Sequence, residues 1–166
     1  MKYLFVDYEK CVGCEICALR CSLEKTGVCN PSAARIHIVR EEEQGVMMPA
    51  VCRHCDEPRC APVCPVKAIS KDAPTGLVRI DPDVCIGCKL CAEACPYGGP
   101  TGIPRPGGQI NPSATIKVLC DLCGGNPACT DMCPTAALQF LGPDAVSLRR
   151  QREGQEKLAV LLARRR

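Results

Sequence analysis

The chain has 166 residues, 17 of them cysteine, whereas aromatic residues make up only 3% and tryptophan is absent. This composition offers little material for a large apolar core, so ligand bonds must supply much of the folding free energy. The formal net charge of +3 owes much to a basic C-terminal stretch without interleaved aromatic residues. That pattern argues against a nucleic-acid-binding protein.

No apolar run approaches the roughly 20 residues that a transmembrane helix needs. Residues 1–7 lack the pattern of a signal peptide and lead straight into the first cysteine loop. Many free thiols without an export signal predict a reducing, cytoplasmic location.

In chain order, a strand is expected over 3–7, directly before the first of four cysteine groups. Each group contains a C-x2-C pair and ends with two cysteines that lie four positions apart. The four groups comprise Cys11, Cys14, Cys17 and Cys21; Cys52, Cys55, Cys60 and Cys64; Cys85, Cys88, Cys91 and Cys95; and Cys120, Cys123, Cys129 and Cys133.

Three cysteines on a loop and a fourth one helical turn later match the ligand run of bacterial ferredoxins, where the fourth cysteine serves a neighbouring cluster. Four runs therefore predict four [4Fe-4S] clusters and a role in electron transfer. Disulfides are disfavoured by the odd cysteine count and the missing signal peptide. Structural zinc is the other alternative, but three thiolates on one loop suit a cube better than a zinc tetrahedron.

The residues beside the cysteines fit the same interpretation. Gly13 and Gly87 precede the second cysteine of their loops, where a missing Cβ lets the backbone aim N–H groups at sulfur. Proline follows the last cysteine of groups two, three and four, whereas Ser22 follows that of group one. We expect Val12 and Ile86 to shield the clusters from water.

Between the groups, alternating residues predict a hairpin over 35–40 and 46–49, packed on groups two and three, and a strand over 76–80. The Gly/Pro-rich stretch 98–108 predicts a loop, and 137–141 predicts a last strand. Lys117 lies in the stretch that leads into group four.

Because each fourth cysteine completes another group's cluster, the groups must form pairs. Groups two and three are expected to form an inner unit, 35–108, inserted into an outer unit of groups one and four, 1–34 and 109–141. In a two-cluster ferredoxin the first and last strands pair, so 3–7 should meet 137–141. The fold class is therefore α+β with nested ferredoxin-like units. The competing arrangement pairs group one with two and three with four.

Nested pairing predicts four ligand sets, which are named set one to set four below. They are Cys11, Cys14, Cys17 and Cys133; Cys21, Cys120, Cys123 and Cys129; Cys52, Cys55, Cys60 and Cys95; and Cys64, Cys85, Cys88 and Cys91. Four oxidised clusters with thiolate ligands would bring the net charge to about −5.

A C-terminal helix is predicted over 142–166, because Pro143 and Asp144 favour a helix start and Glu153 and Lys157 lie at i,i+4 spacing. An apolar stripe on this helix comprises Leu158, Leu161 and Leu162. The helix is expected to dock on a partner or on another copy of the chain; folding back on its own surface is the alternative.

The chain resembles the four-cluster electron-transfer subunits of molybdenum and tungsten oxidoreductases and of hydrogenase complexes. Examples are the iron–sulfur subunits of dimethyl sulfoxide reductase and formate dehydrogenase, and small relatives associated with tungsten aldehyde oxidoreductases. The motifs that carry the resemblance are Cys52-Arg-His-Cys-Asp-Glu-Pro-Arg-Cys60, Cys85-Ile-Gly-Cys-Lys-Leu-Cys-Ala-Glu-Ala-Cys-Pro96 and Cys120-Asp-Leu-Cys123 with Pro127-Ala-Cys129. The family uses the nested pairing.

The resemblance implies a non-catalytic subunit that passes single electrons between a tungsten or molybdenum catalytic subunit, acting on an aldehyde or formate, and a second redox partner. A free polyferredoxin carrier, a hydrogenase-complex subunit and a self-associating conductor are the alternatives. Family members often place Lys or Arg directly before group four, where this chain has Leu119. The chain is also short for the family and is expected to lack a membrane anchor.

Two residues near the motifs have no assigned role. Cys29 belongs to no group and is expected to be a spare, partly buried thiol. His54 lies between two predicted ligands, where it would either tune a cluster by hydrogen bonding or be a surface histidine.

Overall fold

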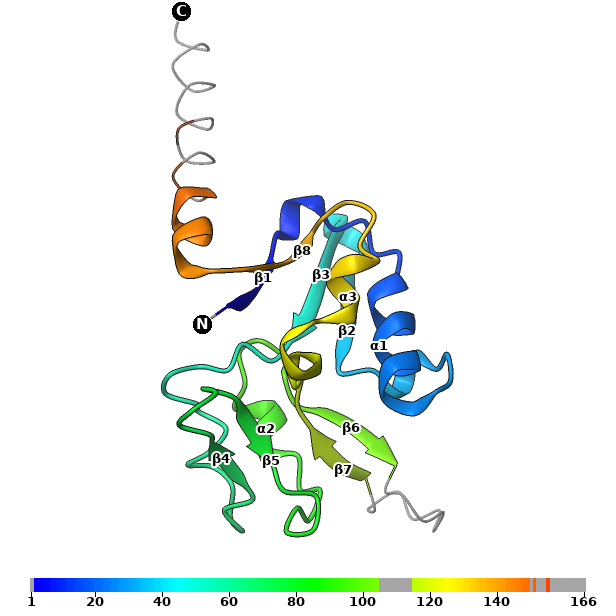
Figure 1. Ribbon diagram of the computed structural model, residues 1–166. Helices are drawn as coiled ribbons and strands as arrows, with labels where there is room; N and C mark the ends of the chain where they lie inside the picture. Colours follow the sequence, from blue (N-terminus) through cyan, green and yellow to red (C-terminus); the bar gives the residue numbers. More distant parts are fainter. Residues whose placement is uncertain (1, 105–114, 150, 152–154, 156–166) are drawn as a thin grey trace, which may run out of the picture.

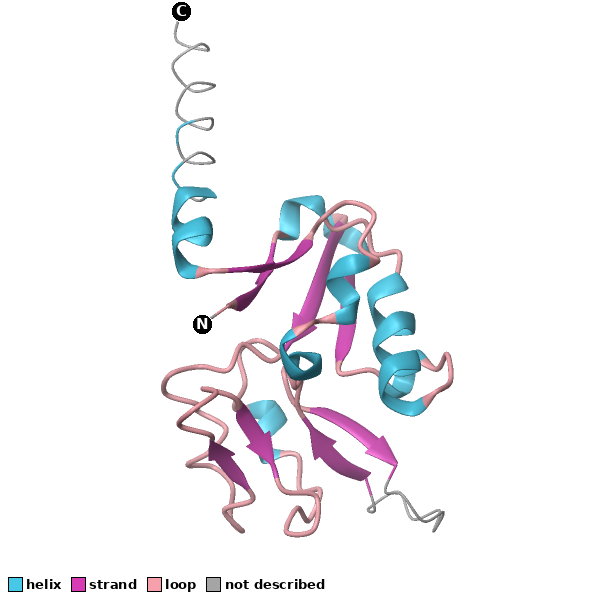
Figure 2. Cartoon of the chain, in the orientation of Figure 1, coloured by secondary structure: helices cyan, strands magenta, loops and turns pink. Residues whose placement is uncertain are grey.

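The computed structural model describes residues 2–104, 115–149, 151 and 155. It is an α+β structure with short helices and four two-stranded antiparallel sheets (Figures 1 and 2). The strands are β1 (Tyr3–Val6), β2 (Ile36–Glu41), β3 (Val46–Val51), β4 (Ile69–Lys71), β5 (Val78–Ile80), β6 (Thr101–Pro104), β7 (Thr115–Val118) and β8 (Leu138–Leu141). The α-helices are α1 (Ile16–Thr26), α2 (Leu90–Glu93) and α3 (Ala128–Asp131), and the 3-10 helices are η1 (Tyr8–Lys10), η2 (Pro31–Ala33), η3 (Glu42–Gln44) and η5 (Leu122–Gly125).

The first and last described strands pair with each other. In β1–β8, Val6 lies opposite Leu138 and Tyr3 opposite Leu141. Leu4, Val6 and Leu138 are buried together, as expected where a strand presents alternate residues to a core. The predicted meeting of these two segments is confirmed.

Helix α1 is longer than the short helices within groups three and four, α2 and α3. It continues past Cys21 to Thr26 and ends at Gly27, which has φ +75° and whose N–H donates to the carbonyl of Leu23 at 2.9 Å. Ser22 stands where the other groups have proline, so nothing stops the helix there. The Ser22 hydroxyl is buried, donates to the carbonyl of Leu19 and accepts from the N–H of Asn30.

The β2–β3 hairpin forms as predicted, with η3 as its acidic turn. Its packing differs from expectation: Ile36 and Val51 lie in the same core as Leu4, Ala18 and Leu138. The hairpin therefore packs on groups one and four, and the expectation that it packs on groups two and three is wrong. Ile36 and Val51 are both almost fully buried, and together they supply apolar area that the short β1–β8 ribbon lacks.

Strands β4 to β7 and helix α2 form the lower part of the molecule in Figure 1. Strands β4 and β5 pair from Ile69 opposite Ile80, and the alternation predicted for β5 is confirmed by a buried Val78 beside an exposed Arg79. A second, smaller core contains Ile69, Val78 and Leu119 together with Cys52 and Cys91.

The stretch predicted as a loop over 98–108 contains a strand. Residues 101–104 form β6, which pairs with β7 from Thr101 opposite Val118; residues 105–108 lie outside the described part. The expectation of a loop was therefore wrong for 101–104. Its cause is a backbone pairing partner about 14 residues away, which local glycine and proline content does not reveal.

A helical segment starts at Pro143, as predicted, and is described through Arg149. Arg149 pairs with Asp7, donates to the side-chain oxygen of Gln139 and lies over the ring of Phe5. These contacts fix the segment on the β1–β8 sheet. The stripe of Leu158, Leu161 and Leu162 lies outside the described residues. Within the described part, no helix has the length and apolar character needed to cross a bilayer.

Candidate cluster-binding sites

Each C-x2-C loop bends at its third residue, which has a left-handed backbone. The φ values are +67° at Gly13, +48° at His54, +72° at Gly87 and +53° at Leu122. Glycine adopts this conformation freely, whereas other residues pay a steric cost. The glycines at two loops predicted the bend there; in groups two and four no residue type signals it.

A second bend follows each Cys-Pro pair. Lys67, Gly98 and Ala136 all have φ between +51° and +63°, and each lies three residues after the last cysteine of its group. The bend turns the next N–H back onto sulfur: Ala68 N–H donates to Cys64 at 3.2 Å and Gly99 N–H donates to Cys95 at 3.3 Å.

The last cysteines of groups one and four receive N–H bonds too. Cys133 accepts from Leu138 and Ala137. Because α1 continues beyond Cys21, the sulfur of Cys21 instead accepts the N–H of Arg35, at 3.3 Å, from 14 residues further along the chain. N–H groups aimed at sulfur stabilise thiolate charge, which iron–sulfur ligation requires.

The thiols of set one lie close enough to influence one another. Burial raises the pKa of Cys17 to about 12, and Cys14, Cys11 and Cys133 add to the rise. Cys133 comes from the far end of the chain, and the β1–β8 pairing brings it here. Its own pKa is lowered, because N–H groups and the Thr135 hydroxyl outweigh its burial.

Set two joins groups one and four in the same way. Burial raises the pKa of Cys129, and Cys120, Cys21 and Cys123 raise it further. Burial likewise raises the pKa of Cys120 to about 11, with the N–H of Leu122 opposing it at 3.4 Å from sulfur.

Sets three and four each line one cavity. The cavity of set three measures about 420 Å³ and has the thiols of Cys52, Cys55, Cys60 and Cys95 in its wall. The cavity of set four is bordered by Cys64, Cys85, Cys88 and Cys91 together with apolar side chains. Cysteines of one group thus lie near a cysteine of another group, as nested pairing predicts, and the assignment of all sixteen to four ligand sets stays a prediction.

All seventeen cysteines carry free thiols. Within the described residues, no three His, Cys, Asp or Glu side chains are arranged to hold a metal ion. Thiolates around one zinc would lie about 3.8 Å apart, since each Zn–S bond is about 2.3 Å. The donor chemistry of every proposed set, four cysteine thiols, fits a [4Fe-4S] cluster.

Of the two unassigned residues, Cys29 differs from expectation, and for His54 one of the two alternatives is excluded. Cys29 is exposed rather than partly buried. His54 is not a surface residue: its Nδ1 accepts the N–H of Val78 at 3.0 Å, and its Nε2 is buried without a hydrogen-bond partner among the described residues. The bond from Val78 fixes the proton of neutral His54 on Nε2. Val12 and Ile86, expected to shield clusters, are 62% and 57% exposed.

Residues 43–142 match the 4Fe-4S dicluster domain. The chain belongs to this family. A polyferredoxin-like subunit of aliphatic sulfonate oxidoreductase from Pyrococcus furiosus is 37% identical over 146 residues, covering 88% of this chain and 76% of the relative. A subunit of anaerobic dimethyl sulfoxide reductase from Escherichia coli is 36% identical over 157 residues, covering 84% of this chain and 72% of the relative.

These relatives confirm the resemblance to iron–sulfur subunits of the dimethyl sulfoxide reductase type. This 4Fe-4S dicluster protein is accordingly an electron-transfer subunit and not a catalytic one. Among solved structures, the active-site complex BamBC of benzoyl coenzyme A reductase matches with a TM-score of 0.47 and 21% identity, over 84% of this chain and 76% of that one.

Proposed function

We propose that the protein relays single electrons through four [4Fe-4S] clusters, between a tungsten- or molybdenum-containing catalytic subunit and a second redox partner. The observation that carries the proposal is that thiols of different cysteine groups lie close together, as Cys17 does to Cys133 and Cys52 to Cys95. [4Fe-4S] clusters supply one-electron chemistry when bound. The chain's own residues supply thiolates, N–H donors to sulfur and exclusion of water.

The sets follow one another in space. Cys129 of set two lies near Cys17 of set one, and Cys52 of set three lies near Cys120 of set two. Cys52 and Cys91, of sets three and four, share one small core. This order supports a linear path from set one to set four.

The two ends of this path reach the surface. Cys14 of set one and Cys88 of set four are exposed, whereas every cysteine of sets two and three is buried or half-buried. The exposed Val12 and Ile86 lie beside these terminal sets. Exposed apolar side chains beside a redox group favour contact with a partner protein. We propose that electrons enter at one terminal set and leave at the other.

The division into an outer unit (1–34 and 109–141), an inner unit (35–108) and a docking helix (142–166) is part of the proposal, with the hairpin reassigned to the outer core. Arg53 follows Cys52 in the sequence and joins the two units, because its guanidinium donates to the carbonyl of Leu4 and to the hydroxyl of Tyr8.

We propose a reducing compartment, the cytoplasm, because clusters with thiolate ligands persist there.

The relatives narrow the choice of partner. One is a subunit of an aliphatic sulfonate oxidoreductase and another a subunit of dimethyl sulfoxide reductase. Both names favour a subunit over a free carrier. We propose that the catalytic partner is an oxidoreductase that acts on a small organic substrate, with an aldehyde or formate as first candidates.

Purification of the native protein from its source tests the proposal. We expect co-purification with a larger subunit that contains tungsten or molybdenum, and about sixteen iron atoms per chain of this protein. Elemental analysis and mass spectrometry of the complex supply both answers. Elution at the mass of the single chain would instead support the free carrier, and a much lower iron content would overturn the four-cluster assignment.

A further inference from the structure

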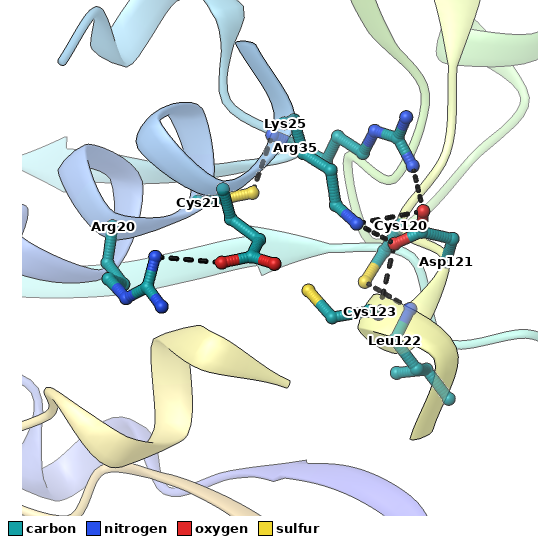
Figure 3. Close-up of polar contacts among 9 residues, drawn as sticks. Arg20, Cys21, Lys25, Arg35, Cys120, Asp121, Leu122 and Cys123 are labelled. Carbon is teal, nitrogen blue, oxygen red and sulfur yellow. Dashed lines mark hydrogen bonds and ion pairs between the residues drawn. The ribbon is translucent and has the colours of Figure 1, made fainter. Parts of the chain in front are cut away.

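Three charged side chains meet beside set two (Figure 3). The Nζ atom of Lys25 lies 2.8 Å from Oδ1 of Asp121, and Nη1 of Arg35 lies 2.7 Å from Oδ2 of the same carboxylate. Lys25 comes from the last turn of α1, Arg35 directly precedes β2, and Asp121 lies between Cys120 and Cys123. Segments about 90 residues apart in the sequence therefore converge on one point.

This charge cluster is linked to the thiols of set two. The backbone N–H of Arg35 donates to the sulfur of Cys21, and Oδ1 of Asp121 accepts the N–H of Cys123 at 3.0 Å. Arg35 and Lys25 act electrostatically on Cys21, and Cys123 acts on Lys25. The three charged side chains therefore lie close enough to set two for their charges to affect the energy of adding an electron there.

This charge cluster of Lys25, Arg35 and Asp121 contains one more cation than anion. Two cationic side chains share a single carboxylate, whereas Arg40 with Glu15 near set one, and Lys71 with Asp56 near set three, pair one to one. The side chains of Lys25 and Arg35 are only 16% and 24% exposed. Water and salt therefore screen the extra positive charge poorly.

We propose that Lys25 and Arg35 raise the reduction potential of the cluster held by Cys21, Cys120, Cys123 and Cys129, and that Asp121 limits the rise. The inference rests on the cluster ligation proposed above. Reduction transfers one electron from a neighbouring cluster, or from a chemical mediator, and adds one negative charge without breaking a bond or moving a proton. A nearby cation stabilises the added charge, and a nearby carboxylate opposes it.

The position of set two gives this effect a consequence for electron flow. Set two lies between set one and set three, where the outer unit meets the inner one. With a raised potential, the cluster of set two is the one that is preferentially reduced when a single electron enters at either end. Lys25 and Arg35 are then positioning residues: they touch no ligand sulfur with their side chains and act through charge.

The test is a redox titration of the loaded protein, followed by electron paramagnetic resonance. In Lys25→Met, one of the four midpoint potentials should fall by about 59 mV, a tenfold change in the one-electron equilibrium constant. In Asp121→Asn the amide oxygen can still accept the Cys123 N–H. The same midpoint potential should rise in this variant by a similar amount. Arg35→Met should lower it while keeping the N–H that donates to Cys21.

Two controls separate charge from structural damage. Lys25→Arg keeps the cation and should leave all four midpoints unchanged. The double variant Lys25→Met with Asp121→Asn removes one charge of each sign and should return the midpoint towards its native value. Shifts in the same direction for Lys25→Met and Asp121→Asn, or unchanged midpoints in both and in Arg35→Met, overturn the inference. A native protein without [4Fe-4S] signals overturns the proposed function itself.

Discussion

Gly99 lies against the backbone of Cys52, and this contact limits which residue the position accepts. A Cβ at Gly99 would lie 2.9 Å from Cα and 3.2 Å from Cβ of Cys52. The same glycine donates its N–H to Cys95. Since Cys52 and Cys95 come from different groups and line one cavity, Gly99 joins two segments that set three needs.

Gly99→Ala should therefore lose the cluster of set three and keep the other three. The backbone of Cys52 has no flexible end that could move aside, so the thiols separate. We expect iron content to fall by about a quarter, measured by iron analysis with paramagnetic resonance to count the remaining clusters. Gly142→Ala is the matched control, because nothing lies within 4 Å of a Cβ there. Full iron content in Gly99→Ala would contradict the argument.

At the scale of elements, the fold is stabilised by pairing between distant segments more than by the length of any strand. The strands β1 and β8 have only four residues each and begin and end the compact part of the fold. A two-stranded ribbon is marginal by itself in water. It is supported here by the core on one side and by the Arg149 contacts with Asp7 and Phe5 on the other.

Arg149→Met should release the segment 143–149 from the β1–β8 sheet. The side chains of Asp7 and Arg149 are 11% and 17% exposed. Without Arg149 the buried Asp7 carboxylate would keep Lys10, at 3.3 Å, but lose the closer and less exposed cation. We expect local opening to become easier by about 1–3 kcal/mol. Hydrogen exchange of the 143–149 amides measures this free energy of local opening. The content of iron–sulfur clusters should stay unchanged. Leu148→Met, at an exposed site, should leave the exchange rates as they are.

At the scale of the whole molecule, cysteines replace the apolar residues that a core would normally contain. The larger core includes Cys17, Cys21 and Cys129, and the smaller one includes Cys52 and Cys91. Without clusters these cores would surround unfilled space between polar thiols. We therefore expect the fold to depend on the ligand bonds, in line with the low aromatic content.

Removal of iron should unfold most of the chain. We expect an anaerobic chelator to abolish most secondary-structure signal in circular dichroism in parallel with the loss of visible cluster absorbance. Reconstitution with iron, sulfide and a reductant should restore both. Intact secondary structure after complete iron removal would show that apolar packing alone is sufficient.

Cluster loss should also become more favourable as pH falls. A cysteine thiol in an unfolded chain has a pKa of about 8.5, and burial raises the pKa of Cys17 and Cys52 further, to about 12. Between pH 6 and pH 8 a thiol freed from iron therefore takes up a proton whether the chain around it is folded or unfolded. Each proton taken up shifts the release equilibrium by about tenfold per pH unit. Chelator titrations between pH 6 and pH 8 measure the slope; a pH-independent equilibrium would contradict ligation by thiolates.

The spacing of residues within each cysteine group is local information, and the sequence expresses it directly. C-x2-C spacing, the glycines at 13 and 87 and the prolines after three groups predicted loops that bend towards sulfur. The β1–β8 pairing was also predictable, because the first and last strands of a two-cluster ferredoxin pair with each other. The same information predicts the four ligand sets, which stay a prediction.

Tertiary structure alone decided which surfaces meet. The side of the hairpin that carries Ile36, the strand β6 and the left-handed backbone at His54 have no local signal, because each depends on a partner elsewhere in the chain. The same holds for Asp121. In the sequence it is an ordinary loop residue, and only the tertiary structure shows its ion pairs with Lys25 and Arg35. Sequence spacing determined the positions of the candidate iron ligands along the chain. Packing between distant segments decided the charges and contacts around them, since those energies depend on neighbours in space.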